Sequence, residues 1–275
     1  MKKLSCILAL CGISLLAMSP RVIPIPQTPV TQELVDQSTV IFKGHVEQTR
    51  ASNLKILPAS NQTILVHVDE VISAAKTMIN LKGATVTIQL KEPGSLKAGA
   101  AATFFTTGWL YGENVALKEV SHITADVNAQ SLQKQVAELQ ARTSDRKLQS
   151  RIQSSAMVFA GKVIASRPLQ AEGGRTNSEH DPDWWTAEVE VQSLLKGPPS
   201  AAKRVSLLFA HSNDVMWFRS PKLKEGQQGI WIATEYKPGG LFPMERAPLL
   251  AVVGPLDYQP SSERDRIQRL LTAGQ

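Results

Sequence analysis

Cysteine is almost missing from this sequence: Cys6 and Cys11 are the only two, and both lie within the first 19 residues. Once that segment is set aside, the chain has no disulfide and no thiolate that could act as a nucleophile or a metal ligand. Its domains must therefore be held together by packing alone. This suits a bacterial periplasm better than the small disulfide-rich domains that eukaryotic cells secrete.

A hydrophobic run long enough to span a bilayer is also missing. The longest apolar stretch, residues 4–17, has about 14 residues, against the roughly 20 that a membrane-spanning helix needs. Two lysines precede it and the small residue Ser19 follows it, which is the pattern of a secretory signal peptide. We therefore predict a signal peptide at 1–19, no transmembrane segment after it, and a periplasmic or secreted protein. Cleavage after Ala17, cleavage after Ser19 and retention as an anchor stay open.

Charge of one sign is only in mild excess. The 30 Lys and Arg residues stand against 24 Asp and Glu, which gives a net charge of +6 spread along the chain. Nucleic-acid-binding proteins gather basic residues into one stripe with aromatic residues between them. We therefore predict no nucleic-acid partner. The excess is interpreted as a solvated surface or as a general attraction to anionic envelope surfaces.

The common catalytic motifs are missing as well. The sequence has no Gly-x-Ser-x-Gly, no Gly-x-x-x-x-Gly-Lys and no His-Glu-x-x-His. Its five histidines show neither the i, i+4 nor the His-x-His spacing of a readable metal site. His211, Ser212 and Asp214 lie together in the sequence, whereas catalytic triads are assembled from separated segments. Ser212, Asn213 and Asp214 are also favoured turn residues. We predict no catalytic residue, no metal and no cofactor.

What the sequence does contain is an internal repeat. Residues 38–46 match residues 155–163 at an offset of 117. Residues 96–105 match residues 223–232 at an offset of 127, each beginning with Leu-Lys-x-Gly and ending in a hydrophobic strand. The matching pieces keep their order while the loops between them change length, which is typical of a duplicated domain.

The pattern of each half predicts a small β-barrel. Residues 64–69 and 184–191 alternate between the two faces of an antiparallel strand. Lys-Gly turns at Gly83 and Gly197 precede the next strands, and apolar helix stripes flank each half, one of them after a capping-box spacing at 262–265. Further strands are expected at 86–90, 114–120, 205–209 and 249–253. The predicted fold is mainly β with flanking helices, as two tandem five-stranded OB-like barrels.

The domain boundaries follow from this repeat. We expect a signal peptide at 1–19, a proline-rich tether at 20–30, a first OB-like domain with a C-terminal helix at 31–145, and a second at 146–275. The linking helix is expected to be continued or restarted over 147–153.

An apolar strand ending in Gly-x-Val, then an alternating strand and a Leu-Lys-Gly turn, resembles the netrin-like, or tissue-inhibitor-of-metalloproteinases-like, OB-fold domain. The motif reads VIFKGHV with LKG at 81–83, and MVFAGKV with LLKG at 194–197. The resemblance implies the fold and a non-catalytic interaction module. Metalloproteinase inhibitors of that family chelate zinc through an amino-terminal cysteine, and disulfides hold the domain. Because cysteine is missing here after residue 11, their inhibitory mechanism is not implied.

Candidate ligand-binding residues lie in and after the long loop of the second half. Trp185 is predicted to point inward, so Trp184 points outward, where it can stack on a sugar or anchor a protein. His180, Asp181 and Asp183 lie beside it, as an ordinary solvated loop or as ligands for a hard cation such as Ca²⁺.

Two functions are compatible with these residues. The predicted one is an exported non-catalytic interaction module that binds a protein or glycan of the cell envelope, in an undefined oligomeric state. The alternative is an envelope hydrolase with a site between the two barrels, built from Asp181, Asp183, His180 or His211.

Overall fold

The structure is a computed structural model that describes residues 30–112, 114–169, 182–198, 203–235 and 250–273. The predicted signal peptide, nearly all of the tether, His180 and Asp181 lie outside these residues. The chain divides into two compact units, one formed around residues 40–127 and the other by residues 32–39 with 128–275. In the described part of the chain, no helix is both long and apolar enough to cross a bilayer.

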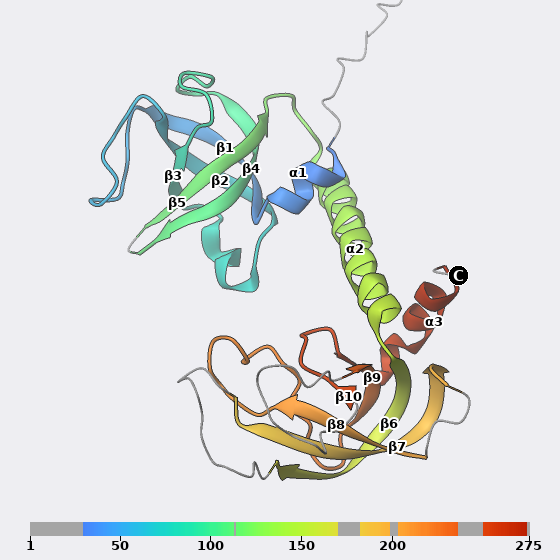
Figure 1. The fold of residues 1–275 in the computed structure, drawn as a ribbon. Helices are drawn as coiled ribbons and strands as arrows, with labels where there is room; N and C mark the ends of the chain where they lie inside the picture. Colours follow the sequence, from blue (N-terminus) through green and yellow to red (C-terminus); the bar gives the residue numbers. More distant parts are fainter. Residues whose placement is uncertain (1–29, 113, 170–181, 199–202, 236–249, 274–275) are drawn as a thin grey trace, which may run out of the picture. The chain divides into compact units, whose positions relative to one another are not determined.

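The first unit is a closed barrel of five strands in the order β1-β2-β3-β5-β4 (Figure 1). The pairing of β3 with β5 is parallel and the other pairings are antiparallel. Phe42 and Phe104 stack in its core with their ring centroids 5.3 Å apart. The elements are β1 (Val40–Thr49), β2 (Thr63–Ser73), the 3₁₀ helix η1 (Lys76–Leu81), β3 (Thr85–Gln89), β4 (Ala101–Tyr111) and β5 (Val115–Ile123).

The second barrel repeats that order. Its short strand β10 pairs in parallel with β8 and antiparallel with β9, which closes the ring β6-β7-β8-β10-β9, and β11 is added at β9. The mainly β fold with two tandem five-stranded barrels is thus confirmed. The strands are β6 (Met157–Pro168), β7 (Trp184–Lys196), β8 (Arg204–Ala210), β9 (Gln228–Glu235), β10 (Leu250–Ala251) and β11 (Tyr258–Gln259).

The two barrels share irregularities of the backbone as well as topology. The pairing of β1 with β2 shifts register at three points, after residues 41, 43 and 46. The pairing of β6 with β7 shifts at three points after residues 158, 160 and 163, so that each lies 117 positions further on. At the middle shift, a Cβ atom on Gly44 would lie 2.4 Å from the carbonyl oxygen of His67, and one on Gly161 would lie 2.6 Å from that of Glu190. The repeated glycine is therefore required by close approach of two strands.

The Leu-Lys-x-Gly segments also adopt one conformation twice. Leu96 and Leu223 are buried in their respective cores. Gly99 and Gly226 have φ values of 80° and 82°, a region that glycine enters without steric cost. Their amides donate to the carbonyls of Val46 and Val163 at 2.8 and 2.9 Å. The repeat seen in sequence is thus a repeat of turns and hydrogen bonds.

The helices belong to the second unit. They are α1 (Gln32–Gln37), α2 (Ala129–Ser154) and α3 (Arg264–Thr272), the last preceded by the 3₁₀ helix η2 (Ser261–Glu263). Helix α2 begins where the Asn128 side chain accepts a hydrogen bond from the Ser131 amide. It runs unbroken through residue 145, the predicted domain boundary. The expected capping box at 262–265 is wrong, because η2 takes up residues 261–263 and α3 starts at Arg264 without a side-chain cap.

Candidate functional site

The predicted site residues that the structure describes lie at the start of β7. Trp185 packs against the core of the second barrel, as its alternation predicts, and stacks on His211 with ring centroids 4.2 Å apart. Trp184 lies on the other face of the strand, edge-on to Trp217 at 5.7 Å. Asp183 is exposed, and its carbonyl oxygen accepts a hydrogen bond from the His211 amide at 2.8 Å. The segment after β8 is therefore tied to the start of β7.

The segment from His211 to Lys222 is built as a chain of turns. The Asp214 carboxylate accepts from the Met216 amide at 2.8 Å, and the Ser212 hydroxyl accepts from the Asp214 amide at 3.1 Å, which is a turn role, as predicted. Lys222 closes the segment, since its ammonium donates to the carbonyls of Ala210 and Trp217 at 2.7 and 2.8 Å. Burial lowers the pKa of Lys222. The backbone of the loop is thus fixed by its own polar groups.

This fixed backbone presents hydrophobic side chains to solvent. Val215, Met216 and Phe218 are 74%, 65% and 60% exposed. We name these three residues the apolar loop. Among the described residues, the only other large hydrophobic side chain exposed to this degree is Ile56, at 74%. In the described part of the chain, three of the four large exposed hydrophobic side chains therefore lie in one turn of the second barrel.

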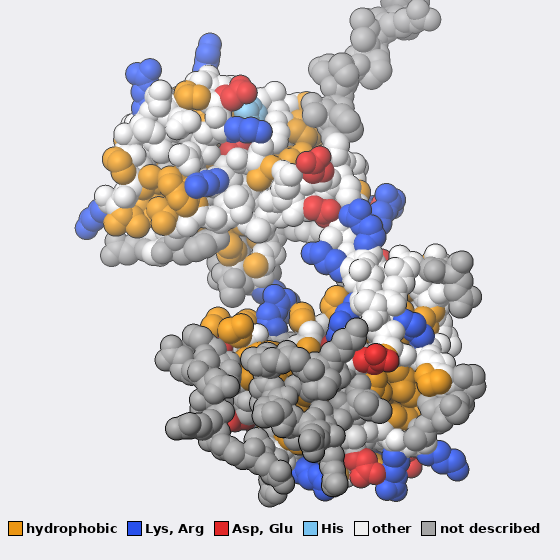
Figure 2. Space-filling view, in the orientation of Figure 1, with side chains coloured by type: hydrophobic (Ala, Val, Ile, Leu, Met, Phe, Trp, Pro, Cys, Tyr) orange, Lys and Arg blue, Asp and Glu red, His pale blue; other side chains and the backbone are white. Residues whose placement is uncertain are grey.

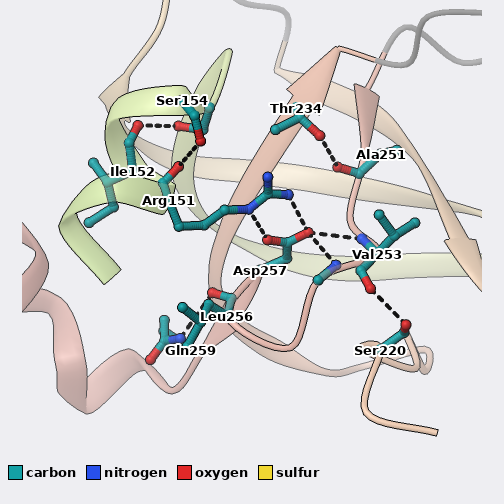
Figure 3. A network of polar contacts seen from close by, with 12 residues as sticks. Arg151, Ile152, Ser154, Ser220, Thr234, Ala251, Val253, Leu256, Asp257 and Gln259 are labelled. Carbon is teal, nitrogen blue, oxygen red and sulfur yellow. Dashed lines mark hydrogen bonds and ion pairs between the residues drawn. The ribbon is translucent and has the colours of Figure 1, made fainter. Parts of the chain in front are cut away.

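A network of hydrogen bonds and ion pairs connects the loop of residues 211–222 to helix α2, as Figure 3 shows. The Ser220 hydroxyl donates to the Val253 carbonyl at 2.6 Å, and the amides of Val253 and Gly254 donate to Asp257, each at 2.8 Å. Asp257 is fully buried and accepts two further hydrogen bonds from the Arg151 guanidinium, at 2.5 and 2.7 Å. The Asp257 carboxylate thus joins the end of α2 to the segment after β10, and Ser220 joins that segment to the loop of residues 211–222.

Lys196 also stabilises the carboxyl end of helix α2. Its ammonium donates to the carbonyls of residues 152, 153 and 155 at 2.7, 2.8 and 2.5 Å. These are carbonyls that the last turn of a helix leaves without an intrahelical donor. Burial lowers the pKa of Lys196. The second barrel and the carboxyl end of α2 therefore form one continuous hydrogen-bonded body.

Two surface cavities lie on the strands of the barrels. One, of about 250 Å³, lies on the outer face of β7 and β8, the strands whose counterparts bind ligands in many OB-folds. Its Arg204 is paired with Glu188 at 3.2 Å. The other, of about 340 Å³, lies beside the Lys43–Asp126 ion pair of the first barrel. Each cavity is thus lined in part by charges that already form an ion pair.

Basic and acidic side chains are both scattered over the face that Figure 2 shows. Within the described residues, no three His, Cys, Asp or Glu side chains converge on a point where they could hold a metal ion. Of the four residues proposed for the hydrolase alternative, Asp183 and His211 are joined by a backbone hydrogen bond, whereas His180 and Asp181 lie outside the described residues. The hydrolase alternative therefore stays a hypothesis.

The site therefore contains two residues that the sequence indicated as ligands and several that it did not. Asp183 and Trp184 lie in it, but Val215, Met216 and Phe218 were not predicted as ligands. A comparison of the two halves would have found them. In the first half the Leu-Lys-x-Gly turn begins at Leu96, six positions after Leu90, the last residue of the stretch 86–90. In the second half it begins at Leu223, fourteen positions after Phe209, the equivalent residue of the stretch 205–209. Neither the protein-family models nor the curated protein sequences compared with this chain match it, so what the site binds must be inferred from its own chemistry.

Proposed function

We propose that the chain is an exported, non-catalytic interaction module that binds a protein of the cell envelope through its apolar loop. The observation that carries this proposal is the concentration of exposed hydrophobic side chains in residues 215–218. Soluble proteins rarely expose such groups together unless the surface is used. Covering one Val, Met or Phe side chain stabilises a complex by about 1.5–3 kcal/mol before the costs of association.

The composition of the loop favours a protein over a glycan. Met, Phe, Trp and Arg are the residue types enriched at the centres of protein interfaces, and residues 216–219 read Met-Trp-Phe-Arg. The most exposed groups are a valine, a methionine and a phenyl ring, which offer sugar hydroxyls no hydrogen bonds. Because the loop backbone is held by Lys222 and Asp214, little ordering entropy remains to be lost on binding.

Export is proposed on the signal-like segment at 1–19 alone. We likewise offer kinship with netrin-like domains as a hypothesis, supported by the OB-like order of strands in both barrels. Fractionation of cells that express the chain, with mass determination of its amino terminus, tests export. Recovery of the chain in the cytoplasm with Met1 to Ser19 intact contradicts it.

Site-specific photocrosslinking tests the binding surface. A photoreactive phenylalanine replaces Met216 in one variant and Ile56 in another, and each is irradiated in the intact envelope. We expect one defined protein adduct from position 216 and none from position 56. The double substitution Val215→Ser with Phe218→Ser should reduce the yield of that adduct at least tenfold, whereas Ile56→Ser, which removes an equally exposed side chain, should leave it unchanged.

Two outcomes overturn the protein-binding proposal. Equal adducts from positions 216 and 56 would show that crosslinking reports only general exposure. A saturable change of tryptophan fluorescence with a member of a glycan panel, lost in Trp184→Ala but kept in the Val215→Ser, Phe218→Ser variant, would assign the site to glycan binding instead.

A further inference from the structure

Two histidines face one another on the outer surface of the first barrel. Residues 45–47 read His-Val-Glu on β1, and residues 67–69 read His-Val-Asp on β2. The central valines are buried, so the histidines and carboxylates of both tripeptides point outward. The antiparallel register places His45 directly opposite His67, and their ring centroids lie 5.1 Å apart with the planes tilted by 35°.

A carboxylate lies against each imidazole. The Nδ1 atom of His45 is 3.0 and 3.2 Å from the two oxygens of Asp69. The Nδ1 atom of His67 is 3.6 Å from Glu47, whose other oxygen accepts a hydrogen bond from the Thr85 hydroxyl at 3.0 Å. In order of contact the four side chains run acid, His, His, acid, and each carboxylate belongs to the strand opposite its histidine, with Asp69 on β2 and Glu47 on β1. At His45 the carboxylate is within hydrogen-bond distance, which favours the tautomer in which Nδ1 carries the proton and Nε2 is the acceptor. Glu47 lies farther from His67, at ion-pair distance.

We propose that His45 and His67 bind one divalent transition-metal ion, of the Zn²⁺ or Cu²⁺ type, through their Nε2 atoms. Since each carboxylate lies at Nδ1, Nε2 is the nitrogen of each ring that we assign to the metal ion. Metal-ligating histidines commonly have this carboxylate at the other ring nitrogen, where it orients the ring and raises its basicity.

The separation of the rings fits a shared ion. With metal-to-nitrogen bonds of about 2.0–2.1 Å and a nitrogen about 1.1 Å from the ring centroid, two imidazoles on a tetrahedral ion have their centroids roughly 5 Å apart. The observed value is 5.1 Å. The side chains of His45 and His67 are 45% and 33% exposed, so an ion can enter from solvent and keep water as its remaining ligands.

The type of ligand determines the type of ion. Imidazole favours Cu²⁺, Zn²⁺ and Ni²⁺, whereas Mg²⁺ and Ca²⁺ require oxygen ligands. In the second barrel, Lys162 and Glu190 occupy the equivalent opposed positions in the register. An ammonium and a carboxylate cannot supply two imidazole nitrogens, so the site belongs to the first barrel alone.

Copper titration of the full chain tests the proposal. We expect calorimetry to show one Cu²⁺ ion bound, and electron paramagnetic resonance to show hyperfine coupling to two imidazole nitrogens. Zn²⁺ should displace the copper and Mg²⁺ should not. His45→Gln and His67→Gln should each remove one nitrogen from the spectrum and most of the affinity. Asp69→Asn should keep both nitrogens and weaken binding about 10- to 100-fold.

The matched control is His211→Gln, which removes an exposed imidazole elsewhere and should leave the copper signal unchanged. Circular dichroism confirms that each variant is folded. Copper bound through a single nitrogen in the wild-type chain would overturn the proposal. Equal copper affinity in the His45→Gln, His67→Gln double variant would also overturn it, since it would show that copper binds at other groups.

Discussion

Between the end of the third strand and the Leu-Lys-x-Gly turn, the first barrel has residues 90–95, whereas the second has residues 211–222. The apolar loop lies entirely within this longer passage. On either side of it, the cores, the bulges and the glycine turns of the two barrels correspond. The duplication has therefore kept the interior and the turns that close the barrel, and function has diverged where a loop could lengthen without disturbing them.

The outer faces of the strands have diverged as well. His45 and His67 correspond to Lys162 and Glu190, which are opposed in the same register. Glu119, whose side chain is almost completely buried against His122 in the first barrel, corresponds to Val252 in the core of the second. The two opposed histidines of the first barrel are thus replaced by a lysine and a glutamate, and the buried glutamate is replaced by a valine.

The largest difference in stability between the barrels is expected at Asp257. Substitution Asp257→Ala leaves the Arg151 guanidinium and the amides of Val253 and Gly254 without their acceptor. Removing one partner of a buried ion pair costs about 3–5 kcal/mol. Urea unfolding followed by tryptophan fluorescence should show this loss of stability, because four of the five tryptophans report on the second barrel: Trp184, Trp185, Trp217 and Trp231.

The control in the first barrel is Asp126→Ala. Asp126 also pairs with a cation, Lys43, but its side chain is 97% exposed, so stability should hardly change. Asp257→Asn keeps an oxygen for the amides and loses the charge, and should give an intermediate loss. Equal effects of Asp257→Ala and Asp126→Ala would show that the network in Figure 3 contributes little.

The shared bulge should be equally intolerant of a side chain in both barrels. In Gly44→Ala and Gly161→Ala the new methyl would lie 2.4 and 2.6 Å from a backbone oxygen, and forcing the strands apart costs about 1–3 kcal/mol. Hydrogen exchange resolved by peptide should show lost protection in β1 and β2 for the first variant and in β6 and β7 for the second. Gly112→Ala meets no atom within 4 Å and serves as the control. Loss of protection in one barrel alone would show that the two bulges are not equivalent.

The sequence predicted the elements that the core determines. Alternation with period two located β2 and β7 and placed Trp185 inward, because one face of each strand must be buried. The two Lys-Gly turns were predicted because only glycine enters the positive φ of Gly83 and Gly197 without strain. These features depend on neighbours in the chain, so a single sequence is enough to predict them.

Features that depend on distant pairing were missed. The opposition of His45 and His67 follows from a strand register that three bulges displace, and no local spacing encodes those bulges. Arg151 and Asp257 meet across 106 residues. Val215, Met216 and Phe218 have the composition of buried residues, and only the hydrogen bonds of the surrounding turns fix them outward. The candidate ligands His180 and Asp181 lie outside the described residues, and their role stays a prediction.

Transfer of the histidine pair to the second barrel would sharpen the comparison. A variant with Lys162→His, Glu190→His, Ile164→Glu and Gln192→Asp repeats the acid, His, His, acid row at the equivalent positions. We expect calorimetry to show a second Cu²⁺ ion. The variant with only the two histidine substitutions should bind that ion about 10- to 100-fold more weakly, since it lacks the orienting carboxylates. No second ion in either variant would mean that β1 and β2 hold the rings in a way that the shared backbone does not explain.

The smallest expected effect distinguishes the barrels in acid. Burial raises the pKa of Glu119, but hydrogen bonds from His122 and the Lys91 amide, with the charges of both residues, outweigh it and hold the pKa below the ordinary 4.5. The unfolded chain therefore takes up a proton first as the pH falls, so this stabilisation is complete above about pH 4.5 and is lost progressively below it. Hydrogen exchange, corrected for its intrinsic rates, should show β5 losing protection as the pH falls below about 4.5 in the wild type. The loss should be smaller in Glu119→Gln and unaltered in the control Glu70→Gln, whose carboxylate is exposed on β2. If Glu119→Gln and the wild type lose protection in parallel, the acid sensitivity of the first barrel has another origin.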